Sequence, residues 1–149
     1  MKWYRVLLLA VLVVIVVPVG GLWLWGRPRA HVPLPTARAS PVDVVKMYVR
    51  AMNDRDFSVC TRMQVSDGQD IGAGWASLPA PNITNLRIGD VHAMTPGLRS
   101  WNESVVVDTT ATLNNFEGFH NSQPDQPWSF ELVRHDSSKP WRIIDQGQG

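Results

Sequence analysis

A continuous apolar segment near the start of the chain restricts its architecture more than any other feature. Residues 6–17 are all apolar, and residues 18–25 extend the segment with only Pro18 and a pair of glycines as weak points. As a helix, the 20 residues from 6 to 25 would be ~30 Å long, about the thickness of the hydrocarbon core of a bilayer. We therefore expect a transmembrane helix over residues 6–25.

The flanks of this segment are typical of a membrane anchor. Basic residues lie on both sides of it, and tryptophans lie at both ends, where indole rings favour the headgroup layer. A cleaved signal peptide is the alternative, because residues 6–17 have the length of its apolar region and follow Lys2 and Arg5. The apolar span continues past that point, and no Ala-x-Ala motif lies at the right distance, so an anchor is favoured.

The anchor divides the chain into four parts. We expect a short cytoplasmic tail at residues 1–5, the membrane span at 6–25, a semi-extended proline-containing linker at 26–39 and one folded domain at 40–149. Basic residues are almost equally distributed on the two sides of the span, so the orientation follows from the short tail, which usually stays in the cytoplasm. The expected protein is a single-pass protein of the cell membrane with its C-terminal domain outside.

Composition argues against several classes of partner and cofactor. The chain has 14 basic and 13 acidic side chains, a net charge of +1 and no basic stripe, so nucleic acid is not an expected partner. The four histidines are scattered, with no Cys or Asp at ligand spacing, so we expect no metal and no cofactor. Cys60 is the only cysteine, and we expect it to be a small buried apolar side chain.

Helical periodicity opens the folded domain. Ser40 is a good N-cap, Pro41 suits the first helical position, and Asp43 would lie near the positive end of the helix dipole. Apolar residues then recur at helical spacing up to an acidic turn at residues 53–56. A second, shorter apolar face follows this turn and contains Phe57, Cys60 and Met63.

Further along the chain the apolar period changes from 3.6 to 2, which predicts strands. We expect a strand at residues 83–94 with a bulge at Gly89, further strands at 105–113 and 128–133, and a last strand that pairs Ile143 with Leu132. The predicted fold class is α+β. Two or three N-terminal helices would pack on a curved antiparallel sheet of three to five strands, preceded by the transmembrane helix.

Two segments carry a resemblance to a known family. The sequence at residues 41–57, PVDVVKMYVRAMNDRDF, resembles the opening helix of nuclear transport factor 2-like domains, and KPWRIIDQG at 139–147 is similar to their last strand. The order of helices and strands agrees over residues 40–149. A short tail, one span and such a domain outside are similar to the layout of small actinobacterial membrane proteins. The resemblance implies a cone-shaped domain with a pocket between helix and sheet.

The same resemblance directs attention to one carboxylate. Relatives of the ketosteroid isomerase and polyketide cyclase type place a carboxylate or a histidine in this pocket for acid-base chemistry. Strand alternation puts Asp145 on the face of Trp141 and Ile143, so it is the inward candidate, whereas Asp108 falls on the face opposite Val107. A solvated Asp145 near the end of its strand is the alternative.

Four aromatic residues are candidates for binding. Tyr48 and Trp141 are expected near the pocket, and the polar loop at residues 114–127 contains two phenylalanines, Phe116 and Phe119. The favoured function is a membrane-anchored extracytoplasmic domain that binds a protein or a cell-envelope ligand without catalysis. The alternatives are an isomerase, cyclase or hydratase that uses Asp145, and a single-span subunit of a secretion or conjugation complex.

Overall fold

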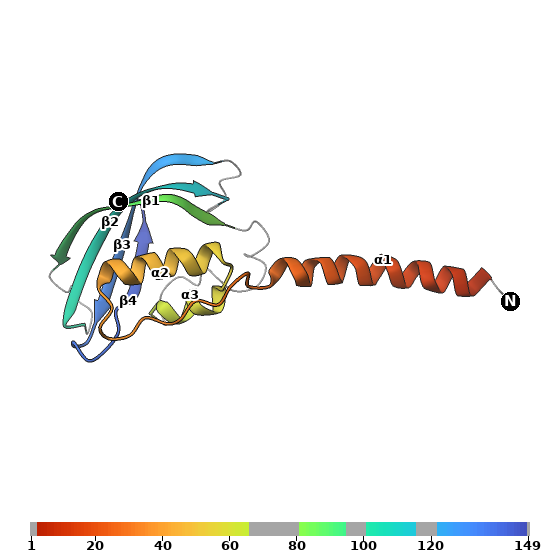
Figure 1. Cartoon of the computed structure of the whole chain (residues 1–149), viewed down its shortest axis with the longest axis horizontal. Coiled ribbons are helices and arrows are strands. Elements are labelled where there is room, and N and C mark those ends of the chain that lie inside the picture. Colours follow the sequence, from red (N-terminus) through yellow and green to blue (C-terminus); the bar gives the residue numbers. More distant parts are fainter. Residues whose placement is uncertain (1–2, 66–80, 95–100, 116–121, 149) are drawn as a thin grey trace.

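The computed structural model describes residues 3–65, 81–94, 101–115 and 122–148, and the side chains of residues 4–10 lie outside that description. Over these ranges the elements are α1 (Trp3–Gly26), α2 (Pro41–Asn53), α3 (Phe57–Met63), β1 (Asn82–Met94), β2 (Glu103–Asn114), β3 (Gln123–Arg134) and β4 (Arg142–Gly147). Helices α2 and α3 cover one face of a curved sheet, and α1 extends away from both layers (Figure 1). The predicted α+β class is confirmed.

Helix α1 contains the whole segment for which a helix was expected. It has 24 residues and includes Pro18 without ending there. Most of its described side chains from residue 11 onward are exposed. Within the described part of the chain, no helix reaches the length and apolar character needed to cross a membrane.

Helix α2 begins where the sequence predicts. The Ser40 hydroxyl accepts a hydrogen bond from the backbone N–H of Asp43 at 3.1 Å, and the Asp43 carboxylate accepts one from the backbone N–H of Ser40 at 3.3 Å. This capping box satisfies backbone donors that have no partner within the helix. The side-chain hydrogen bond from Ser40, followed by the backbone one, lowers the pKa of Asp43.

Both short helices bury the apolar stripe that their periodicity indicates. In α2 the buried side chains are Val44, Val45, Tyr48, Val49, Ala51 and Met52. In α3 they are Phe57, Cys60 and Met63, as predicted for the second apolar face, together with Val59. Arg55 has a positive φ of 62° in the turn between the two helices, which lets the chain reverse there.

The sheet is antiparallel throughout and has the strand order β1-β2-β3-β4. Its inner face, which packs against the helices, carries Val107, Ala111 and Leu113 from β2 and Trp128, Phe130 and Leu132 from β3. These alternating residues are the ones that the period of 2 predicts. The pairing of Leu132 with Ile143 is confirmed as well.

The predicted bulge in β1 is also confirmed. The β1–β2 register shifts between Ile88 and Val91, across the position of Gly89. A Cβ at Gly89 would lie 3.3 Å from the backbone oxygen of Asp108, so the strands approach too closely there for a larger residue without adjustment.

The segment between α1 and α2 has no helix or strand, as expected for a linker, but it lies against the domain. The backbone N–H of Arg29 donates to the carbonyl oxygen of Asp54 at 2.7 Å. Val32 is only 5% exposed and belongs to the hydrophobic core. The linker is therefore partly docked on the domain from Arg29 onward.

Candidate functional site

A bulge near the C-terminal end of β4 reverses the expected orientation of Asp145. Leu132 pairs with Ile143, but the next residue of β3, Glu131, pairs with Asp145, so Ile144 is an extra residue. An extra residue moves every later side chain to the other face of the strand. Asp145 therefore lies on the outer face and is exposed, which agrees with the solvated alternative and not with the inward orientation that strand alternation indicated.

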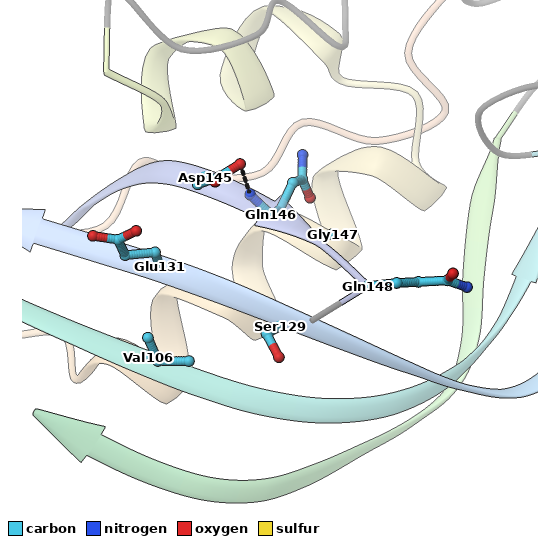
Figure 2. A pocket seen from close by; sticks show the side chains of 7 residues that line it. All are labelled: Val106, Ser129, Glu131, Asp145, Gln146, Gly147 and Gln148. Carbon is cyan, nitrogen blue, oxygen red and sulfur yellow. Dashed lines mark hydrogen bonds between the residues drawn. The ribbon is translucent and has the colours of Figure 1, made fainter. Parts of the chain in front are cut away.

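The outer face of the sheet contains a shallow depression of about 350 Å³ beside Asp145. It is lined by Val106, Ser129, Glu131, Asp145, Gln146, Gly147 and Gln148. Figure 2 shows Val106, Glu131 and Asp145 following one another across β2, β3 and β4. The depression thus lies on the side of the sheet away from α2 and α3.

Negative charge concentrates in this depression. Glu131 and Asp145 are directly opposite each other on neighbouring strands. Glu131 accepts a hydrogen bond from the hydroxyl of Ser104 at 3.3 Å, and Asp145 accepts one from the backbone N–H of Gln146 at 2.9 Å. In the described part of the chain, neither carboxylate forms an ion pair with a basic side chain. Like charges at opposite positions of a sheet repel.

Asp108 extends the acidic surface onto β2. It lies on the face opposite Val107, as predicted, and accepts a hydrogen bond from the Ser129 hydroxyl at 2.7 Å. The Nδ1 atom of His92 lies 3.6 Å from its other carboxylate oxygen. The carboxylate thus separates the serine from the histidine, so these residues do not form the serine–base contact that a nucleophilic serine requires.

Gln146 occupies the inward position that was expected for Asp145. Its Nε2 atom donates to the hydroxyl oxygen of Tyr48 at 2.8 Å, and the Nε2 atom of Gln64 donates to the same oxygen at 3.1 Å. Tyr48 also meets Phe130 edge to face, with 6.0 Å between the ring centroids. The Oε1 atom of Gln146 is buried and has no hydrogen-bond partner among the described residues. No feature of the sequence indicates that Gln146 faces inward, because it does so only as a result of the bulge.

The two aromatic candidates that the structure describes, Tyr48 and Trp141, are both buried. Tyr48 is fully buried, and Trp141 is buried beneath the guanidinium of Arg134, which lies 4.3 Å from the centroid of its ring. Neither ring therefore offers an open surface to a ligand. Phe116 and Phe119 lie outside the described residues.

Neither the buried thiol nor the metal-ligating side chains among the described residues offer a reactive site. Burial, followed by the charge of Asp56, raises the pKa of the Cys60 thiol to about 12, which makes it a poor nucleophile. Among the described residues, no group of three or more His, Cys, Asp or Glu side chains is arranged to hold a metal ion.

Comparison with known proteins assigns the chain to no family. No family model matches it, and no curated protein matches it. What this chain does must therefore be inferred from its own residues.

Proposed function

We propose that the protein is a membrane-anchored, non-enzymatic binding module. Helix α1 anchors it in the cell membrane, and the outer face of its sheet binds a protein partner through basic side chains of that partner. The observation that carries the proposal is the direct pairing of Glu131 with Asp145 in the outer depression. The remaining support comes from the composition of α1 and from the position of Asp145.

The anchor is supported by the character of α1. No charged residue occurs in the sequence from 6 to 25. Several large apolar side chains of this helix are more than half exposed, including Val14, Val17 and Leu24. In water such a surface would be costly, whereas a bilayer core would cover it. An extracytoplasmic position for the domain follows from the expected cytoplasmic location of residues 1–5.

The acidic outer face supports recognition of a cationic partner. Folding places two carboxylates opposite each other, and neither forms an ion pair in the described part of the chain, so their repulsion opposes folding. A lysine or arginine from a partner would remove the repulsion and add charge-assisted hydrogen bonds. The depression on the outer surface of β3 and β4 also gives such a side chain a place to bind.

The position of Asp145 favours binding over catalysis. An acid-base carboxylate works in a site that excludes water, and Asp145 is exposed. The inward neighbour Gln146 carries a carboxamide, which does not act as an acid or a base at neutral pH. We extend the proposal to the fold: two helices ahead of a sequentially ordered antiparallel sheet are compatible with a nuclear transport factor 2-like domain.

A site-specific crosslink tests the binding surface. A photoreactive residue at Gln148, which lines the depression, should crosslink a partner in native membranes, whereas the same residue at exposed Ser138 in the β3–β4 turn should not. The double variant Glu131→Gln/Asp145→Asn should lose this crosslink. It should also unfold at the same or a higher urea concentration, since it removes a like-charge pair. An unchanged crosslink in the double variant would contradict the proposed surface.

Membrane fractionation tests the anchor. The full chain should remain in the membrane after alkaline carbonate extraction, with an intact mass of 16.7 kDa. A lower mass would indicate a cleaved segment instead. A cysteine introduced at exposed Ser137 should react with a membrane-impermeant maleimide in intact cells. Cys60 gives little background because it is buried.

A further inference from the structure

The C-terminal end of α1 is joined closely to the folded domain. Only Arg27 and Pro28 lie between this helix and the hydrogen bond that Arg29 donates to the carbonyl oxygen of Asp54. Three residues later, the backbone N–H of Val32 donates to the carboxylate of Asp56 at 3.2 Å. The turn between α2 and α3 is therefore held beside the end of α1.

A guanidinium group stacks on the ring of each of two tryptophans at this end of α1. The Cζ atom of Arg27 lies 4.4 Å from the ring centroid of Trp23, and that of Arg55 lies 4.7 Å from the ring centroid of Trp25. The first contact joins α1 to the residue that directly follows it, whereas the second joins α1 to the α2–α3 turn. Cation–π stacking leaves the edges of a guanidinium available for hydrogen bonds to oxygen atoms.

Two of the cations in this region, Arg27 and Arg29, have no acidic partner within the described part of the chain. Both are exposed. The nearby acids have other partners. Asp54 pairs with Arg50 at 3.5 Å, and Asp56 is buried with hydrogen bonds from the linker. Burial, and then the charge of Arg29, lower the pKa of Arg55, so the two guanidinium groups are close enough to repel each other.

We propose that Arg27 and Arg29, at the junction of α1 with the α2–α3 turn, bind the phosphate groups of anionic phospholipids and hold that turn against the membrane surface. This inference rests on the proposed anchoring by α1, but it does not depend on the orientation of the chain. It deepens that proposal by naming the lipid class and the side of the domain that faces the bilayer.

Anionic lipid is the ligand that suits this position best. Trp23 and Trp25 end an apolar helix, and indole rings favour the headgroup layer, so the two arginines would lie at the depth of lipid phosphates. Arginine recognises phosphate through parallel N–H donors. If the domain lies outside the cell, the positive-inside rule does not explain basic residues here, whereas headgroup binding does.

Tryptophan quenching in nanodiscs tests the inference. Full-length chain carrying Trp3→Phe is inserted into discs that contain mixed phosphatidylglycerol and phosphatidylcholine, with bromine on the acyl chains of one lipid at a time. Four further tryptophans, Trp75, Trp101, Trp128 and Trp141, also emit, so the two losses of emission are compared instead of the total signals. Bromine on acyl chains quenches only indoles that reach the bilayer, so the ratio of these losses measures the enrichment of anionic lipid around Trp23 and Trp25. Removing an arginine from an anionic surface should lower this preference about fivefold per residue.

The variants separate charge from structure. Arg27→Gln/Arg29→Gln should bring the lipid preference close to one, whereas Arg27→Lys/Arg29→Lys should keep most of it. Removal of two exposed cations elsewhere, in Arg38→Gln/Arg62→Gln, should leave the preference unchanged. The Arg29 substitution should not disturb folding, because the contact of this residue with Asp54 uses its backbone N–H.

The outcomes distinguish the two proposals. If both brominated lipids quench strongly but the glutamine variant has the same lipid preference as the original chain, headgroup binding is excluded and the anchor stands. If neither lipid quenches the two tryptophans, α1 does not enter the bilayer, and both proposals fail. A preference that falls only in the glutamine variant supports the headgroup surface.

Discussion

The buried carboxylate of Asp56 accepts a hydrogen bond from the backbone N–H of Val32, 24 positions earlier in the chain, at 3.2 Å. The Nδ1 atom of His31 lies 3.3 Å from the same oxygen, and the hydroxyl of Ser58 donates to the other oxygen at 2.9 Å. Asp56 is only 1% exposed, so its charge is removed from water. These hydrogen bonds offset that cost and join the linker to the α2–α3 turn.

Replacing Asp56 by asparagine should destabilise the protein by about 1–3 kcal/mol. The amide of asparagine has one oxygen acceptor where the carboxylate has two, so either the hydrogen bond from Val32 or the one from Ser58 loses its acceptor. The free energy of unfolding can be measured by urea titration in detergent, followed by circular dichroism. The matched control is Asp125→Asn, because the Asp125 side chain is 71% exposed and its ion pair with Arg87 lies at the surface, where such pairs contribute little. It should change the free energy by less than about 0.5 kcal/mol. Equal effects of the two variants would contradict this role of Asp56.

The contribution of Asp56 should depend on pH. Burial alone would raise the pKa of this carboxyl, but hydrogen bonds from Val32, Ser58 and His31 outweigh it and hold the pKa below its ordinary value. A lowered folded-state pKa stabilises the protein above the unfolded-state pKa, about 3.9, and this stabilisation is lost as pH falls through the folded-state value. The difference in unfolding free energy between the original chain and Asp56→Asn should therefore shrink under acid conditions. A constant difference from neutral pH down to about pH 3 would exclude this linkage.

The elements that were predicted correctly depend on local signals. The Ser40 cap and the alternation of Val107, Ala111 and Leu113 arise from residues close together in sequence, so their patterns can be read directly. Backbone geometry then makes each pattern specific for a helix start or a half-buried strand. The α+β class followed from the order of these elements.

The site was not predictable in the same way. The bulge at Ile144 depends on how β3 and β4 pair, and no glycine or proline marks it. A period of 2 has no tolerance for an extra residue, so Asp145 lies on the face opposite to the one indicated, and Gln146 takes the inward position. The burial of Val32 was not predicted for a related reason, because a single apolar residue among prolines belongs to no periodic pattern.

The hydroxyl of Tyr48 should be energetically coupled to Gln146, which is 98 positions away in sequence. Tyr48→Phe removes the acceptor of two amide donors and should cost about 1–3 kcal/mol. Gln146→Leu removes one of these donors together with its buried Oε1 atom, so the double variant should be more stable than the sum of the single effects predicts. The coupling energy, from urea titrations of all four proteins, should be about 0.5–3 kcal/mol. Strict additivity would show that the hydrogen bond does not contribute.

Cys60 should report the opening of the domain. It is the only cysteine in the chain and is 1% exposed, and burial raises the pKa of its thiol to about 12. At about pH 8 a folded molecule therefore contains almost no thiolate, and disulfide reagents should react only after the α2–α3 region opens. Labelling in urea should be fast, and labelling in buffer slower by orders of magnitude.

The Asp56→Asn variant supplies the control for this labelling experiment. If labelling follows opening, each 1.4 kcal/mol of lost stability should accelerate it about tenfold. The exposed control Asp125→Asn should leave the rate nearly unchanged, because it removes only a surface ion pair with Arg87. Fast labelling of the original chain in buffer would show that Cys60 is accessible in the folded protein. If the labelling rate is unchanged by Asp56→Asn, the opening motion around Cys60 is independent of the docking of the linker.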